Sequence, residues 1–312
     1  MASFILAFHV VFPLFILMAL GYFLKIIKLY DEHTLKKMNT VVFRVFLPVL
    51  LFLNIYNSDF EEAFNKQLLL YSVIAVIICF VILCAVIPCI VKDSRDITVM
   101  VQGIYRSNFV LFGIPVTASI YGNDNLGLAS IMAAFIIPLF NILAVILFES
   151  FREGKVSIKN IIKEVFKNPL VIAGILGMLI LRFNFRLPVI VTDTMWDIGN
   201  IAQPLSLIVL GGTFTFAGAK KYAKYLTFGC LGRLIIVPAI VLSIAVLLGF
   251  RQMELVILMV MFGAPTAVGS FAMAQELGGN GELAGQIVVT TSAASIFTIF
   301  GWIFILSNFG LI

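Results

Sequence analysis

The chain has 312 residues, of which 62% are apolar and only 12% charged, and its mean hydropathy is +1.12. A soluble domain has about half apolar and about a quarter charged residues, so this composition excludes a large soluble domain. The net charge of +5 is spread between hydrophobic runs rather than gathered in a basic patch, which argues against nucleic acid as a partner. The four cysteines match no metal-binding spacing, and no metal or other cofactor is expected.

Apolar runs divide the chain into membrane-spanning segments, each of which needs about 20 apolar residues. Runs bounded by charged residues or by Gly and Asn give ten candidate spans, at 4–24, 39–56, 68–91, 97–121, 126–149, 168–182, 200–217, 226–248, 254–277 and 283–306. We therefore predict an all-α integral membrane protein with ten transmembrane helices. Before the seventh span, Asp193 and Asp197 lie beside Trp196, which fits either an amphipathic stretch at the interface or the start of that span.

Charged residues in the connecting loops predict the orientation of the chain. The loops after the first, third, fifth and seventh spans hold most of the 21 Lys and Arg residues, including Lys36, Arg95 and Lys221. The opposite loops hold few basic residues and an acidic cluster at 59–62. Because basic loops face the cytoplasm, both termini are expected on the non-cytoplasmic side of the cell membrane.

The two halves of the chain share short motifs in the same order. Pro13-Leu14 recurs as Pro169-Leu170 at an offset of 156 residues, and Phe112-Gly113-Ile114-Pro115 recurs as Phe262-Gly263-Ala264-Pro265 at an offset of 150. Because each half contains five spans, an odd number, the second half must cross the membrane in the opposite direction. We therefore predict two inverted repeats, at 1–149 and 168–312, joined by a short cytoplasmic linker at 150–167.

The repeated proline motifs predict that the fourth and ninth helices are broken and meet near the membrane midplane. Proline removes a helical hydrogen bond, and the neighbouring glycine lets the chain bend. At about 1.5 Å per residue, Pro115 and Pro265 lie roughly 12 and 16 Å from a span end, near the middle of a core about 30 Å thick. Each break is expected to begin a half-helix with free N–H groups that favour an anion, at Val116 and Thr117 and at Thr266 and Ala267.

Charged side chains inside the spans restrict the chemistry. No Asp or Glu lies in the middle of a span, which argues against a carboxylate-pair cation antiporter and against an intramembrane enzyme. Arg44 and Arg233 lie near cytoplasmic span ends, where they are expected to snorkel to the surface. Arg106 fits either contact with a substrate or an anchoring role. Asn108 is the stronger candidate, because a buried amide can hydrogen-bond a carboxylate without a permanent charge. Asn141, Gln203 and Gln275 are further polar candidates.

Several of these motifs carry a family resemblance. Span four contains Arg106-Ser107-Asn108 followed by Phe112-Gly113-Ile114-Pro115, and the second half contains Asn168-Pro169-Leu170 and the segment from Pro265 to Glu276. With these motifs the chain resembles, over nearly its whole length, the auxin efflux carrier family, which includes the plant PIN-FORMED carriers and short bacterial permease-like members. One departure is Gly269, which follows Ala267-Val268 where bacterial relatives often have Asn.

The resemblance implies a scaffold made of spans 1, 2, 6 and 7 and a moving transport part made of spans 3–5 and 8–10. It implies a homodimer formed through the scaffold. It also implies that the broken helices cross at Pro115 and Pro265, with the substrate carboxylate bound beside the crossing and close to Asn108. The short linker between the halves lacks the long regulatory loop of the plant members.

We therefore predict an elevator-like, alternating-access secondary transporter for a small organic anion, a mono- or dicarboxylate, rather than an enzyme. Its partners would be that anion and the lipid bilayer. The predicted substrate-binding residues are Asn108, Gly113, Pro115, Val116, Thr117, Pro265, Thr266, Ala267, Asn141, Gln275 and Arg106. Two alternatives stay open: a sodium-coupled organic-anion symporter with a bile-acid-symporter-like fold, and a membrane module that senses a ligand without transporting it.

Overall fold

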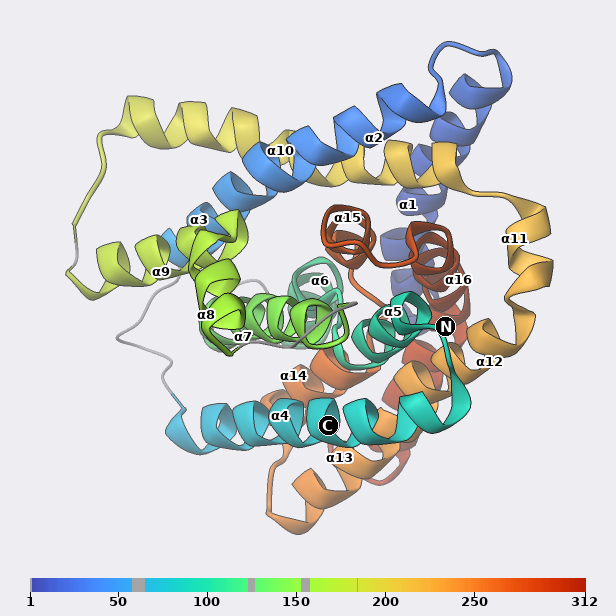
Figure 1. Ribbon diagram of the computed structural model, residues 1–312. Coiled ribbons are helices and arrows are strands. Elements are labelled where there is room, and N and C mark those ends of the chain that lie inside the picture. The colour runs from blue at the N-terminus through green and yellow to red at the C-terminus, as the bar shows by residue number, and fades with distance from the viewer. Residues whose placement is uncertain (1, 58–64, 123–126, 153–157, 184) are drawn as a thin grey trace.

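The computed structural model describes residues 2–57, 65–122, 127–152, 158–183 and 185–312, and nearly all of these residues are helical (Figure 1). The helices are α1 (Ala2–Ile26), α2 (Glu32–Val41), η1 (Val42–Phe46), α3 (Leu47–Tyr56), α4 (Lys66–Ile90), α5 (Ser94–Tyr105), α6 (Phe109–Tyr121), α7 (Gly127–Ser150), α8 (Ile158–Lys167), α9 (Pro169–Arg182), α10 (Val189–Thr213), α11 (Phe216–Lys221), α12 (Ala223–Leu231), η3 (Gly232–Ile236), α13 (Val237–Leu247), α14 (Gln252–Gly263), α15 (Val268–Glu276) and α16 (Gly281–Asn308).

Five helices of the described chain are long and apolar enough to cross a membrane, namely Glu32–Tyr56, α4, α7, Ala223–Leu247 and α16. A bent pair, Ile161–Lys167 with Pro169–Arg182, would be a sixth. These helices confirm a multi-pass helical membrane protein. The fourth and ninth predicted spans are each divided into two half-helices, α5 with α6 and α14 with α15. The count of ten spans and the inverted repeat stay predictions.

The structure settles one further sequence prediction and leaves several others untested. Helix α10 begins at Val189, so the segment with Asp193 and Asp197 is the start of that helix rather than a separate interfacial stretch. The acidic cluster at 59–62 and residues 153–157 of the predicted linker lie outside the described residues. The domain boundaries and the orientation of the termini stay predictions.

The helices form an outer frame around the two broken pairs. In Figure 1, α2, α3 and α10 run along one edge and α4 and α13 along the opposite edge, with α5, α6, α14 and α15 between them. Helix α14 is buried along Leu255–Gly263. Helix α4 is apolar on all sides and exposes Leu70, Ile74 and Val81, which suits a face toward lipid.

Helices α1 and α10 approach each other so closely that their backbones touch. A Cβ atom on Gly211 would lie 1.9 Å from the Met18 carbonyl oxygen, and one on Gly21 would lie 2.0 Å from the Ile208 carbonyl oxygen. No residue with a side chain fits at either position without separating the helices. The glycines thus fix this crossing, and α10 packs against α3 as well.

Two π-helical turns, η1 and η3, lie inside long helices just before prolines. Pro48 and Pro238 follow these turns at the start of α3 and α13. Pro238 has no N–H to donate to the Leu234 carbonyl four residues earlier. The indole N–H of Trp302 donates to that carbonyl at 2.9 Å instead. The wider π turn at η3 also carries Arg233.

Candidate functional site

The two broken helices cross at their breaks. The chain leaves the helical conformation at 106–108, between α5 and α6, and at 264–267, between α14 and α15. Backbone hydrogen bonds join the breaks, from Asn108 N to Pro265 O at 2.8 Å and from Ala267 N to Arg106 O at 3.3 Å, with Ser107 and Thr266 forming an antiparallel bridge between them. Each break therefore supplies partners for backbone groups that a helix end leaves unsatisfied.

The prediction that the fourth span breaks at Pro115 is wrong. Pro115 lies inside α6, and the break comes before that helix begins. Gly113, Val116 and Thr117 also lie within α6, so the N–H groups of the last two are not at a free helix end. A proline inside a membrane helix is tolerated because its neighbours satisfy the freed carbonyl. An extended break needs backbone partners, and the second break provides them only around Ser107.

The second break contains Pro265, as predicted, but the N–H groups expected to be free are occupied. The Thr266 N–H donates to Thr291 Oγ1 at 3.2 Å, and the Ala267 N–H bonds to the first break. Helices α6 and α15 both begin without a side-chain cap at their N-termini. The N–H groups that could serve an anion therefore belong to the first turns of these two helices.

The prediction that Arg233 snorkels to the membrane surface is also wrong. Its side chain is fully buried, and its guanidinium lies at the C-terminal ends of α5 and α14. It donates to four backbone carbonyls, those of Ala264 at 2.7 Å, Met261 at 2.8 Å, Ile104 at 3.0 Å and Tyr105 at 3.1 Å. Helix C-termini carry partial negative charge, so one guanidinium stabilises both ends. Arg44, by contrast, is exposed and pairs with Glu276 at 3.6 Å.

A cavity of about 160 Å³ lies between the crossing and helices α3, α7, α9 and α10. Most of its wall is apolar, with leucines from α3 and α9 and phenylalanines from α6 and α7. Its polar wall residues are Asn54, Arg106, Ser107, Asn108, Asn141, Gln203 and Ser206. The volume is close to that of an engineered cavity that holds benzene, about 150 Å³. The space suits a small organic molecule.

Arg106 supplies the only charge among the described residues that line this cavity. Its side chain is 6% exposed, and its guanidinium donates to Asn141 Oδ1 at 2.8 Å and contacts the sulfur of Met273. No ion pair joins it to a carboxylate of the described residues. Because a buried cation without a counter-ion is costly, the wall around Arg106 favours an anion.

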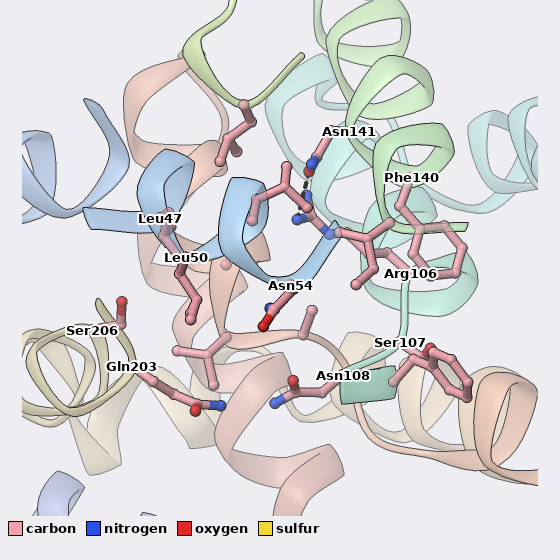
Figure 2. A pocket seen from close by; sticks show the side chains of 17 residues that line it. Leu47, Leu50, Asn54, Arg106, Ser107, Asn108, Phe140, Asn141, Gln203 and Ser206 are labelled. Carbon is pink, nitrogen blue, oxygen red and sulfur yellow. Dashed lines mark hydrogen bonds between the residues drawn. The ribbon is translucent and has the colours of Figure 1, made fainter. Parts of the chain in front are cut away.

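Amide side chains line another part of the cavity. Figure 2 shows the amide groups of Asn108 and Gln203 pointing toward one another, with Asn54 on the same side and the linked pair of Arg106 and Asn141 further away. Asn108 Nδ2 is buried without a hydrogen-bond partner among the described residues. An unpartnered amide N–H next to a cavity is available to a ligand.

The cavity collects some of the predicted site residues and leaves out others. Arg106, Asn108, Asn141 and Ala267 line it. The remaining predictions, Gly113, Pro115, Val116, Thr117, Pro265, Thr266 and Gln275, are absent from its described wall. The sequence reasoning missed Asn54 and Ser206. Asn54 met the same criterion as Asn108, an amide within an apolar span, but it lies near the end of its span.

Comparison with known proteins shows the family of the chain. Residues 6–303 match the family described as membrane transport protein. The chain belongs to this family. It is 24% identical over 304 residues to an uncharacterized transporter from Methanocaldococcus jannaschii, covering 94% of this chain and 97% of the relative. It is 26% identical over 297 residues to an uncharacterized transporter from Methanothermobacter thermautotrophicus, covering 94% and 96%. The resemblance to the auxin efflux carriers is confirmed, and the protein is a membrane transporter rather than an enzyme.

Proposed function

We propose that this membrane transport protein is a secondary transporter that moves a small organic anion, a mono- or dicarboxylate, across the cell membrane by alternating access. The observation that carries the proposal is Arg106, a buried guanidinium that faces a cavity and has no carboxylate partner among the described residues. A bound anion would supply the missing negative charge. The uncapped N-termini of α6 and α15 add partial positive charge at the same crossing.

The position of the cavity supports an elevator-like mechanism. One side of its wall comes from α3, α9 and α10, which belong to the proposed scaffold, and the other side comes from the crossing and α7, which belong to the proposed transport part. A shift of the crossing past α3 and α10 would carry a bound anion from one side of the membrane to the other. A scaffold homodimer and termini on the non-cytoplasmic side belong to the same proposal.

The test is counterflow of radiolabelled carboxylates in proteoliposomes that contain the purified protein. A panel of mono- and dicarboxylates is compared with uncharged amides and with amines of similar size. We expect exchange of at least one carboxylate and of no amine. Exchange of amines or neutral solutes alone would overturn the proposal, and binding without exchange would favour a ligand-sensing module.

Asn108→Ala tests the site within the same assay. We expect this variant to weaken carboxylate exchange about 10-fold while it still purifies as a folded protein, because the amide would contribute one hydrogen bond from the cavity wall. Asn57→Ala is the matched control, since Asn57 is an exposed amide at the end of α3, outside the cavity wall. Repeating the exchange with and without a sodium gradient measures whether sodium is coupled.

A further inference from the structure

The cavity has two chemically different ends. At one end lie the guanidinium of Arg106 and the amide oxygen that it holds on Asn141. At the other end lie the amides of Asn54, Asn108 and Gln203 (Figure 2). Much of the remaining wall is apolar and includes Leu47, Leu50 and Phe140. A ligand that fits both ends therefore has two polar groups separated by a short apolar body.

The charged end is open because residue 269 is glycine. A Cβ atom on Gly269 would lie 3.4 Å from Arg106 Nη2, and the next nearest atom, Leu47 Cδ1, would be 4.0 Å away. A Cβ atom at this position would already be in van der Waals contact with the guanidinium, and a longer side chain would take up space beside it. Gly269 thus leaves the space in which a carboxylate can reach Arg106.

The amide end is neutral. Amide side chains offer both N–H donors and carbonyl acceptors. The only charged residue of the described wall is Arg106, which lies at the other end. A neutral amide, hydroxyl or carbonyl group of a ligand would find complementary partners there. A second carboxylate would be buried without a counter-ion, which is far less favourable.

We infer that the cavity selects a short monocarboxylate with a neutral hydrogen-bonding group at its other end. The carboxylate binds Arg106 beside Gly269, and the neutral group binds Asn54, Asn108 and Gln203. This inference rests on the proposed transport of organic anions, and it narrows the substrate class to anions that carry a single carboxylate. It also places Asn108 at the neutral group rather than at the carboxylate, where the family resemblance placed it.

Matched ligands test the charge. Binding to the purified protein is measured by isothermal titration calorimetry at pH 8 with linear dicarboxylates of three to six carbons, their half-amides and the corresponding monocarboxylates. At the chain length that binds best, we expect the half-amide to bind on the order of 100-fold more tightly than the dicarboxylate, whose second charge is unpaired. A dicarboxylate that binds as tightly as its half-amide would overturn the inference and leave the proposed function intact. Absence of binding by every carboxylate, in this series and in the transport panel, would instead overturn the proposed function.

Substitutions at position 269 test the place of the carboxylate. Gly269→Asp puts a carboxylate next to Arg106, and we expect it to abolish binding of the half-amide by internal neutralisation. Gly269→Asn fills the same space without the charge, so we expect it to weaken binding by crowding but less than Gly269→Asp does. Equal loss in the two variants would contradict binding of the carboxylate at this position. Thermal unfolding of each variant checks that it is folded.

Gln203→Leu tests the neutral end separately. We expect the affinity for the half-amide to fall about 10-fold, because one hydrogen bond is lost. The affinity for the monocarboxylate should not change, so the difference in affinity between the two ligands shrinks by the same factor. Equal weakening of both ligands would show that Gln203 does not contact the neutral group and would overturn that part of the inference.

Discussion

Two buried arginines flank the crossing of the broken helices, and their surroundings differ in a way that separates structure from function. Arg233 lies at the C-terminal ends of α5 and α14, where four backbone carbonyls occupy its guanidinium. Arg106 lies in the first break, with Asn141 and Met273 as its partners, and it faces the cavity. Both side chains are buried, Arg233 completely and Arg106 with 6% exposed.

The comparison shows that burial alone does not identify a binding residue. A guanidinium has five N–H donors, and their partners decide what it does. The carbonyls around Arg233 use its hydrogen-bonding capacity and its charge to hold two helix ends. Arg106 keeps donors for a ligand, so the same side chain supports stability in one region and recognition in the other.

The largest effect is expected from Arg233→Ala. The variant leaves carbonyls at the ends of two half-helices without their partner, and we expect a loss of about 3–5 kcal/mol of folding stability. The measurement is the yield of monodisperse protein and its thermal unfolding temperature. Arg182→Ala, which removes an exposed arginine at the end of α9, is the control and should change stability by less than about 0.5 kcal/mol. If the Arg233→Ala variant is as stable as this control, Arg233 does not stabilise the fold and the proposed difference between the two arginines is wrong.

Arg106→Gln should affect binding rather than folding. Removing the charge that faces the ligand should weaken carboxylate binding on the order of 100-fold, about 2.7 kcal/mol. Folding stability should fall by no more than about 1 kcal/mol, because the substitution also removes an unpaired buried charge. Calorimetric titration and thermal unfolding of the same preparation give both values. If the variant instead unfolds as Arg233→Ala does, Arg106 is structural and the distinction between the two arginines fails.

Pro115 and Pro265 differ in the same way in their backbone surroundings. Pro265 lies in a break and its carbonyl accepts from Asn108, whereas Pro115 lies within α6. Pro265→Ala lets helical geometry extend into the break, so we expect transport to fall several-fold. Pro115→Ala should change transport by less than about two-fold, because it restores a hydrogen bond in an existing helix. Initial exchange rates in proteoliposomes compare the pair, and equal effects would place a functional break at Pro115 after all.

The smallest effect is expected from Trp302→Phe. This variant removes the N–H that satisfies the Leu234 carbonyl next to Arg233, at a cost of about 0.5–1.5 kcal/mol in folding stability. Carboxylate affinity should be unchanged, since Trp302 is not part of the cavity wall. Denaturant-free thermal unfolding and ligand titration make the measurement. A change in affinity without a change in stability would connect the Arg233 region to the binding site.

Much of the fold could be predicted from the apolar pattern, but the first break could not. Proline and glycine pointed to Pro115, and the signal was correct only for Pro265. The break at Ser107 has no helix-breaking residue of its own. Its extended backbone is stabilised by hydrogen bonds to the other break, whose residues are more than 150 positions away in the chain.

The candidate site was predictable to a similar extent. Asn108, Asn141 and Arg106 were expected as polar groups in apolar spans, and they do line the cavity. Asn54 and Ser206 come from α3 and α10, and no sequence motif indicated that they lie opposite the crossing. That placement follows from helix packing between distant segments, which residue type alone does not encode.

The sequence by itself determined the membrane environment, the family and the presence of arginines within the apolar spans, because hydropathy and motifs are local properties. The roles of the two arginines and the position of the first break were decided only by the tertiary structure. Both depend on hydrogen bonds across the crossing, such as those from Arg233 to Ile104 and from Asn108 to Pro265. A buried charge or an extended backbone is stable only where such partners are present, and these partners come together only in the folded chain.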